Sequence, residues 1–236
     1  MSAPKMAMVL AAGIGSRMRP LTDDRPKALV EVGGKALIDH MLDRLAEAGV
    51  TDAVVNAHHF GERLINHVEA RQTPWVIVSD ERDQLLETGG GLKKARILLG
   101  DDPVWVANID SVWIEGATPA LETLAAAWDP DKMDACLLLA PMDNLLGLDG
   151  PGDFFLAEDG RLTHRGTEPK APYAYIGVQI LKPQIVDNGP EGPFSVFARW
   201  MEAMVKGRLY GAVMDGFWMH VGDPRARNEA EARLRG

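Results

Sequence analysis

Cysteine is nearly absent from this chain, and its scarcity removes two kinds of architecture. The 236 residues include one cysteine, Cys136, so neither an intramolecular disulfide nor a cysteine zinc cluster is possible. No run of about 18 apolar residues occurs, which excludes a membrane-spanning helix. The N-terminus lacks the charged and then apolar plan of a signal peptide, because the apolar run 6–12 is short and leads directly into glycines. We therefore expect a cytoplasmic protein with no membrane partner.

An excess of positive charge is also missing. The chain has 25 Lys and Arg against 34 Asp and Glu, a formal net charge of −9, which argues against non-specific nucleic-acid binding. Four cations nevertheless fall within a short stretch, at Arg17, Arg19, Arg25 and Lys27. We therefore expect a small anionic substrate at that place and no nucleic-acid partner.

The stretch before these cations is an apolar run that ends at two glycines, Gly13 and Gly15. Glycine lets backbone N–H groups approach an anion closely, because no Cβ intervenes. A strand, a glycine turn and converging cations together indicate a polyphosphate site. A P-loop is excluded because no Gly-Lys-Ser/Thr string occurs, and a dinucleotide fingerprint is excluded because Met18 stands where its third glycine is required. A structural turn with solvated arginines is the alternative.

The full string L-A-A-G-I-G-S-R-M-R-P-L-T, followed by R-P-K-A-L, resembles the signature of the sugar-phosphate nucleotidylyltransferases. The resemblance implies that the backbone of this segment cradles a nucleoside triphosphate. It also implies that Arg17 neutralises charge on the leaving pyrophosphate and that Lys27 holds the α-phosphate or the sugar phosphate. The residues that it implies in nucleotide binding are Leu10, Ala11, Ala12, Gly13, Gly15, Ser16, Arg17 and Lys27.

Asp110 follows an apolar strand that begins near Trp105, which puts its carboxylate at the same sheet edge as the glycine turn. Mg²⁺ takes oxygen ligands and commonly bridges one or two carboxylates to substrate phosphates. The family resemblance implies that Asp110 is catalytic and holds Mg²⁺, with Mn²⁺ as a possible substitute, although Ile109 replaces the family's glycine. Asn108 is expected to contact the sugar phosphate. From the residues alone, Asp110 could equally be a helix or turn cap.

The late segment F-W-M-H-V-G-D-P resembles the family's W-x-D-x-G-T segment, with His220 at the position of the aspartate. Imidazole prefers softer divalent ions than Mg²⁺, which leaves three alternatives. His220 ligates a metal such as Mn²⁺, Asp223 takes its place, or His220 contacts phosphate while Asp110 holds Mg²⁺ alone. Asp223 also fits the N-cap of a last helix, with Pro224 at its first position. We take His220 as the second metal residue.

A second glycine turn, L-E-T-G-G-G-L, opens a helix near residue 90. The resemblance implies that Glu87, Thr88 and Gly89 contact the nucleobase, whereas a plain structural turn is the alternative. Asn56 or His58 could also line the nucleotide pocket, at the end of another strand. The neighbouring His58 and His59 are not expected to share a metal, because adjacent strand residues point to opposite faces.

The sugar side of the site is less clearly marked. Asp153 and Gly177 occupy places where relatives contact the sugar phosphate, so we expect both to bind substrate. A turn aspartate is an equally good interpretation of Asp153. Lys170, in an E-P-K string that only loosely resembles the family's E-K-P, has no assigned role.

Alternation of short apolar runs with helical patterns predicts an α/β fold. We expect a Rossmann-like, mainly parallel sheet with helices on both faces and loops or short antiparallel strands over 141–173 on the substrate side. A single domain, 1–236, would have a nucleotide-binding half, 1–110, and a sugar-phosphate half, 111–236. The expected strands are 6–11, 53–57, 75–79, 103–107, 135–140 and 174–181, and the expected helices are 36–48, 60–70, 90–99, 117–127, 194–206 and 224–234.

The implied reaction converts a nucleoside triphosphate and a sugar 1-phosphate into an NDP-sugar and pyrophosphate. The short length, the L-E-T-G-G-G loop and the G-P-G-D-F segment are most similar to bacterial N-acetylmuramate-1-phosphate uridylyltransferases, enzymes of cell-wall recycling. A mannose-1-phosphate guanylyltransferase or a choline-phosphate cytidylyltransferase is the alternative enzyme. The non-enzymatic alternative is a regulatory subunit that binds a nucleotide sugar, favoured by Ile109 and His220. The sequence predicts no oligomeric state.

Overall fold

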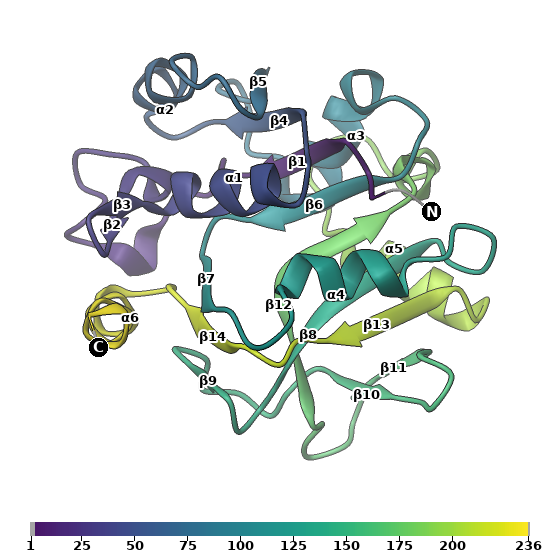
Figure 1. The fold of residues 1–236 in the computed structure, drawn as a ribbon. Coiled ribbons are helices and arrows are strands. Elements are labelled where there is room, and N and C mark those ends of the chain that lie inside the picture. Colours follow the sequence, from purple (N-terminus) through teal and green to yellow (C-terminus); the bar gives the residue numbers. More distant parts are fainter. Residues whose placement is uncertain (1–2, 236) are drawn as a thin grey trace.

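The computed structural model describes residues 3–235, which fold around a nine-stranded mixed sheet (Figure 1). Its order is β11-β10-β12-β6-β1-β4-β5, with β8 paired to β12 and β13 paired to β8. Four neighbouring strands run parallel to one another: β1 (Met6–Leu10), β4 (Asp52–Ala57), β5 (Trp75–Asp80) and β6 (Val104–Asn108). The predicted mainly parallel sheet is therefore confirmed.

Strand β12 (Tyr173–Leu181) reverses the direction of the sheet. It pairs antiparallel with β6 on one side and with β8 (Ala135–Pro141) on the other, and β13 (Leu209–Val213) then runs parallel to β8. The short strands β10 (Phe154–Leu156) and β11 (Leu162–His164) pair antiparallel beyond β12. The predicted loops and short strands over 141–173 are thus confirmed.

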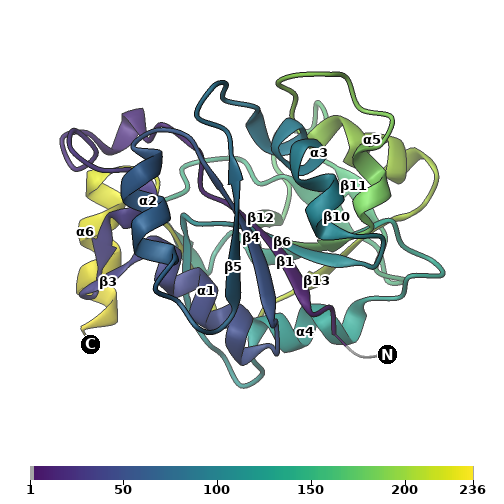
Figure 2. The same ribbon diagram turned by 90° about the horizontal axis from the view of Figure 1, so that it is seen from above.

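Side chains of β1 alternate between two cores, as the two-residue period of a strand requires. Ala7 and Val9 belong to the core on the α1 side, while Met8 joins the core that contains Leu92 and Ala95 of α3. Figure 2 shows α1 and α3 on opposite sides of the central strands. The predicted helices on both faces are confirmed, as α1 (Leu37–Glu47), α2 (Gly61–Val68), α3 (Glu87–Leu99), α4 (Ala120–Ala127), α5 (Phe197–Val205) and α6 (Pro224–Leu234).

Several short elements were not predicted from the sequence. Strands β7 (Ser111–Ile114) and β14 (Phe217–His220) are two of these, and β2 (Glu31–Val32), which pairs with β3 (Lys35–Ala36), is another. β7 and β14 form a three-stranded sheet with β9 (Leu145–Leu146), which lies in the region where short strands were predicted. Three 3₁₀ helices span 16–18, 27–29 and 183–186. These elements are too short for a periodic pattern to identify them.

Helix α6 returns the end of the chain to the N-terminal half (Figure 1). Its Glu231 accepts a hydrogen bond from the Gly33 N–H at 2.8 Å, and Arg227 Nε donates to the Glu31 carbonyl at 2.8 Å. These bonds hold α6 against β2 and the turn that follows it. Within residues 3–235, no helix has the length and apolar character that crossing a bilayer requires. The cytoplasmic address stays a prediction.

Candidate active site

A cavity of about 510 Å³ opens at the carboxyl ends of β1, β4 and β6, where parallel sheets bind ligands. It is built from segments that are far apart in the sequence, including the loop after β1, the start of α3 and Ser195. Eleven predicted site residues line it: Leu10, Ala12, Gly13, Gly15, Ser16, Arg17, Lys27, Glu87, Thr88, Asn108 and Asp110. The predicted residues outside its lining are Ala11, Gly89, Asp153, Gly177 and His220.

The loop after β1 presents a row of backbone donors. Among residues 3–235, the N–H groups of Gly13, Ile14, Gly15 and Ser16 donate to no other protein group. Gly15 has a φ of 68°, and a Cβ there would lie 2.9 Å from the Cβ of Lys27. Glycine is therefore required at position 15, and the resulting concavity of N–H groups suits an anion.

Asn56 holds the base of this loop. Its Oδ1 accepts hydrogen bonds from the N–H groups of Ala11 at 2.6 Å and Ala12 at 3.2 Å. These two N–H groups therefore point toward β4, and the open donors begin at Gly13. Asn56 itself lines the cavity, but His58 does not, because its Nδ1 lies 2.7 Å from the carbonyl oxygen of Glu81.

Two cations face the cavity in different surroundings. Lys27 is 8% exposed, and its Nζ forms an ion pair with Asp110 Oδ2 at 2.8 Å. Arg17 is exposed, on the 3₁₀ helix that follows the glycine loop, and makes no ion pair within residues 3–235. The exposed Arg17 and the buried, paired Lys27 thus line the same cavity.

The ionisation of Asp110 is set by two opposing effects. Burial raises the pKa of this carboxyl, whereas the charge and the hydrogen bond of the Lys27 ammonium lower it, and the net result is a pKa below the ordinary value. Asp110 is therefore a carboxylate at neutral pH. β6 ends at Asn108, so Asp110 lies in the turn to β7 rather than in the strand, and its carbonyl accepts from the Val221 N–H at 2.8 Å.

The donor set for a divalent metal is small. No group of three or more His, Cys, Asp or Glu residues within 3–235 lies close enough to hold an ion. Asp110 binds Lys27 through Oδ2 only, and Oδ1 makes no hydrogen bond within those residues. One carboxylate oxygen facing an anion-binding cavity fits Mg²⁺, which commonly takes one or two protein carboxylates and completes its shell with phosphates and water.

The segment 217–224 lies next to Asp110, and its two polar residues, His220 and Asp223, make different contacts. Asp223 Oδ1 accepts from the Ala226 N–H at 2.8 Å, and Pro224 is the first residue of α6. The N-cap interpretation of Asp223 is confirmed. His220 is half-buried on β14, and burial lowers the pKa of its imidazole. Its ring packs beneath Gly222, where a Cβ would lie 2.7 Å from His220 Nε2.

The triple glycine lies at the start of a helix and packs against a distant loop. Helix α3 begins at Glu87, so Gly89 and Gly90 lie in its first turn. Both N–H groups donate to the Phe194 carbonyl, at 2.8 and 3.1 Å, and a Cβ on Gly89 would collide with the Phe194 ring. Close packing of the segment 192–196 therefore requires these glycines, and a nucleobase contact of Gly89 stays a prediction. Glu87 and Thr88 remain at the cavity.

Asp153 and Gly177 organise the sheet next to the cavity. Asp153 Oδ2 accepts from the Tyr175 N–H at 2.9 Å, which ties the start of β10 to β12. Gly177, with φ 86°, lies in the irregular register of β12, and a Cβ there would be 3.0 Å from Asn108 Nδ2. Close approach of β12 to Asn108 therefore requires this glycine. Lys170 is exposed and makes no ion pair within residues 3–235.

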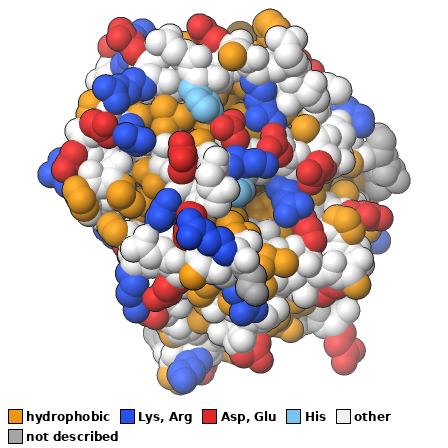
Figure 3. All heavy atoms as spheres, turned by 60° about the vertical axis from the view of Figure 1, so that its left-hand side comes forward, with side chains coloured by type: hydrophobic (Ala, Val, Ile, Leu, Met, Phe, Trp, Pro, Cys, Tyr) orange, Lys and Arg blue, Asp and Glu red, His pale blue; other side chains and the backbone are white. Residues whose placement is uncertain are grey.

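The sequence reasoning missed Ser195 and Leu85 as lining residues. Ser195 comes from a loop about a hundred residues beyond α3, so no local pattern could have connected the two. On the face drawn in Figure 3, basic and acidic side chains are interspersed instead of forming one basic surface.

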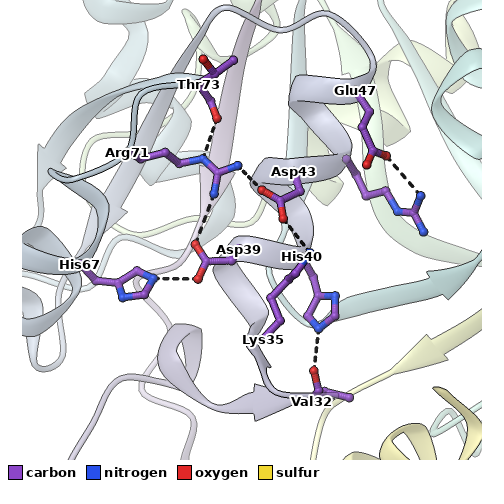
Figure 4. A network of polar contacts seen from close by, with 10 residues as sticks. Val32, Lys35, Asp39, His40, Asp43, Glu47, His67, Arg71 and Thr73 are labelled. Carbon is purple, nitrogen blue, oxygen red and sulfur yellow. Dashed lines mark hydrogen bonds and ion pairs between the residues drawn. The ribbon is translucent and has the colours of Figure 1, made fainter. Parts of the chain in front are cut away.

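A second group of titratable side chains lies away from the cavity, between α1 and the end of α2 (Figure 4). Arg71 pairs with Asp39 at 3.3 Å and with Asp43, and it donates to the Thr73 carbonyl at 2.9 Å. His67 Nε2 lies 2.8 Å from Asp39. Each member has a partner within the group, so we interpret it as a structural network.

A mixed α/β sheet with an anion-binding loop after its first strand is typical of nucleotidyltransferases that use nucleoside triphosphates. Residues 7–144 match the MobA-like NTP transferase domain, and the chain belongs to this family.

Comparison with curated proteins extends the match to nearly the whole chain. The N-acetylmuramate alpha-1-phosphate uridylyltransferase of Caulobacter vibrioides is 56% identical over 98% of this chain and 98% of its own length. The protein of the same name from Neisseria meningitidis serogroup B is 34% identical over 96% of each chain. The structure of a UTP-bound UGPase from Acinetobacter baumannii aligns with a TM-score of 0.82, at 17% identity, over 98% of this chain and 93% of that one.

Proposed function

We propose that this protein transfers UMP from UTP to N-acetylmuramate α-1-phosphate and releases pyrophosphate. The observation that carries the proposal is the row of open N–H groups from Gly13 to Ser16, flanked by Arg17 and by the Lys27–Asp110 pair. This arrangement suits a polyphosphate and the charge that moves during its cleavage. The base and sugar follow from the 56% identity with the Caulobacter uridylyltransferase.

The chemistry requires positioning more than covalent participation. An oxygen of the sugar phosphate attacks the α-phosphorus in line, the bond to the β-phosphate oxygen breaks, and pyrophosphate leaves with that electron pair. The attacking phosphate is already ionised, so no general base is needed. Catalysis then rests on orientation and charge neutralisation.

The residues around the phosphate end of the cavity have distinct roles in this proposal. Gly13 to Ser16 bind the triphosphate through backbone N–H groups, and Arg17 neutralises the charge that develops on the leaving pyrophosphate. Lys27, buried and fixed by Asp110, holds the α-phosphate or the sugar phosphate. Mg²⁺ would be held by Asp110 Oδ1, and when bound it offsets the charge of the two phosphate groups.

Nucleobase and sugar binding involve the remaining cavity residues. Glu87 and Thr88, at the start of α3, contact the base in this proposal, and Asn108 contacts the sugar phosphate. The division into a nucleotide half, 1–110, and a sugar-phosphate half, 111–236, needs one qualification. Ser195 and Gly222 also line the cavity, so both parts of the chain contribute to the nucleotide end.

The test is pyrophosphate release across the four NTPs, each paired with the 1-phosphates of N-acetylmuramic acid, N-acetylglucosamine, glucose and mannose, and with phosphocholine. Each pair is measured with Mg²⁺ and with Mn²⁺. We expect the highest kcat/KM for UTP with N-acetylmuramate 1-phosphate. Faster release with GTP and mannose 1-phosphate, or with CTP and phosphocholine, would replace the substrate. UTP binding without release from any pair would favour a regulatory subunit.

A further inference from the structure

Asn56 is hydrogen-bonded at both ends of its side-chain amide, and it is only 2% exposed. Its oxygen accepts from the N–H groups of Ala11 and Ala12, as described above. Its nitrogen, Nδ2, donates to Glu81 Oε1 at 3.0 Å. A continuous chain of hydrogen bonds therefore runs from Glu81, through Asn56, to the base of the phosphate loop.

Glu81 is an unusual residue to find at this position. It is the first residue after β5 and is 0% exposed, and its second carboxyl oxygen, Oε2, has no hydrogen-bond partner within residues 3–235. Burying an unpaired polar atom is costly. Its backbone is fixed on both sides, because its N–H donates to the Ala57 carbonyl at 2.8 Å and its carbonyl oxygen lies 2.7 Å from His58 Nδ1.

The orientation of the Asn56 side-chain amide depends on which group accepts a hydrogen bond from its nitrogen, Nδ2. Rotating a side-chain amide by half a turn exchanges its oxygen for an NH₂ group of nearly the same shape. After that rotation the NH₂ group of Asn56 would face the backbone N–H groups of Ala11 and Ala12, and no acceptor would lie between these donors. Within the described residues, Glu81 is the hydrogen-bond acceptor of Asn56 Nδ2, so the carboxyl favours the observed direction.

We propose that Glu81 is a positioning residue for the nucleoside triphosphate, acting through Asn56. By accepting from Asn56 Nδ2, Glu81 holds the amide oxygen toward Ala11 and Ala12. The loop is thereby fixed with the following N–H groups, from Gly13 to Ser16, open to the cavity. The identity of the ligand rests on the proposed function, whereas the hydrogen-bond chain does not.

Gly91 of α3 gives independent support. A Cβ at this position would lie 3.0 Å from Glu81 Oε1 and 3.1 Å from Asn56 Nδ2, the two atoms of the hydrogen bond. The helix therefore packs directly on the pair and leaves it no room to rearrange. The Gly91→Ala substitution would press on this hydrogen bond without removing any polar group.

The experiment compares two substitutions that leave different groups at position 81. Glu81→Leu removes the acceptor, whereas Glu81→Gln keeps an oxygen that can accept from Asn56. Glu69→Leu, at an exposed residue on the end of α2, is the matched control. For each protein we would measure the Kd of UTP by calorimetry, the KM of both substrates, kcat and Tm.

We expect Glu81→Leu to raise the Kd and KM of UTP by roughly tenfold, the effect of leaving one buried donor without a partner. The KM of the sugar phosphate should stay within about twofold, because the loop serves the nucleotide in both ground and transition states. Glu81→Gln should recover most of the UTP affinity, and Glu69→Leu should match the wild type.

Unchanged UTP affinity in Glu81→Leu would overturn the inference. So would a lower kcat and Tm with both KM values unchanged, which indicates a purely structural role. If Glu81→Leu does not fold, Gly91→Ala decides, because it should weaken UTP binding by a few-fold, and unchanged affinity there also overturns the inference. If the wild-type protein binds UTP but does not turn it over, the proposed function is contradicted. The role of Glu81 can then still be tested, because the Kd of UTP can be compared between the wild type and the variants.

Discussion

Removing the ammonium of Lys27 should affect stability and activity in separable ways. In Lys27→Met the unbranched four-atom stem of the side chain is kept in an uncharged form, but Asp110 loses the cation at 2.8 Å. The side chain of Lys27 is 10% exposed and that of Asp110 is 20% exposed, so little water can replace the lost partner. The substitution therefore leaves a buried carboxylate uncompensated.

The size of the effect follows from this burial. Breaking a buried ion pair by removing one partner costs about 3–5 kcal/mol, and the partial exposure of Asp110 favours the lower end, about 3 kcal/mol. For a chain of this size, such a loss lowers Tm by about 6–12 °C. The double variant Lys27→Met with Asp110→Asn carries no unpaired charge and should recover about half of that loss or more.

The assay combines urea unfolding with pyrophosphate release for the wild type, both single variants and the double variant. We expect kcat/KM to fall by about 10²-fold or more in all three variants, with stability recovered only in the double variant. A Lys27→Met protein with wild-type stability would refute the burial argument. Recovery of activity in the double variant would show that Lys27 serves only to neutralise Asp110.

Three further measurements test other parts of the structure. Arg17→Ala should lower kcat by about 10²-fold. Its Tm should stay unchanged, because Arg17 is exposed and makes no ion pair within the described residues, and a lower Tm would contradict this expectation. Arg71→Ala, which removes the centre of the network with Asp39 and Asp43, should cost about 1–2 kcal/mol in urea unfolding and leave kcat unchanged. Burial raises the pKa of Glu81 above its ordinary value, so the folded state binds more protons than the unfolded state between the two pKa values. The unfolding free energy of the wild type, minus that of Glu81→Gln, should therefore fall as pH rises above the ordinary pKa of a glutamate. A difference that stays constant with pH would refute the shift.

Much of the fold could be predicted because the central strands are buried on both faces. The apolar runs at Met6–Leu10 and Val104–Asn108 are long enough to be distinguished from loops, and the alternating helices imply parallel pairing. Strands β7 and β14 were not predicted. They have four residues each, and their pairing joins segments about a hundred residues apart.

In the candidate site, too, some features could be predicted from the sequence and others could not. The loop from Gly13 to Arg17 is continuous in sequence, so residue types alone indicated an anion site. The packing of Gly89 against Phe194 could not be predicted, because sequence spacing gives no information on that contact. Glu81 gave no signal at all, because an isolated glutamate after a strand looks like a surface residue until its burial is known.

Strand β12 has a consequence for the order in which the chain can fold during synthesis. β12 lies between β6 and β8, so a ribosome that has released only the first 140 residues presents both strands without the partner between them. Val104, Trp105, Val106 and Ala107 are almost completely buried in the finished sheet, and an unpaired apolar edge is a site for aggregation. The nascent chain must therefore keep the edge of β6 covered until Leu181 has left the ribosome. Slower translation of residues 141–181 would lengthen the time during which this edge lacks its partner strand.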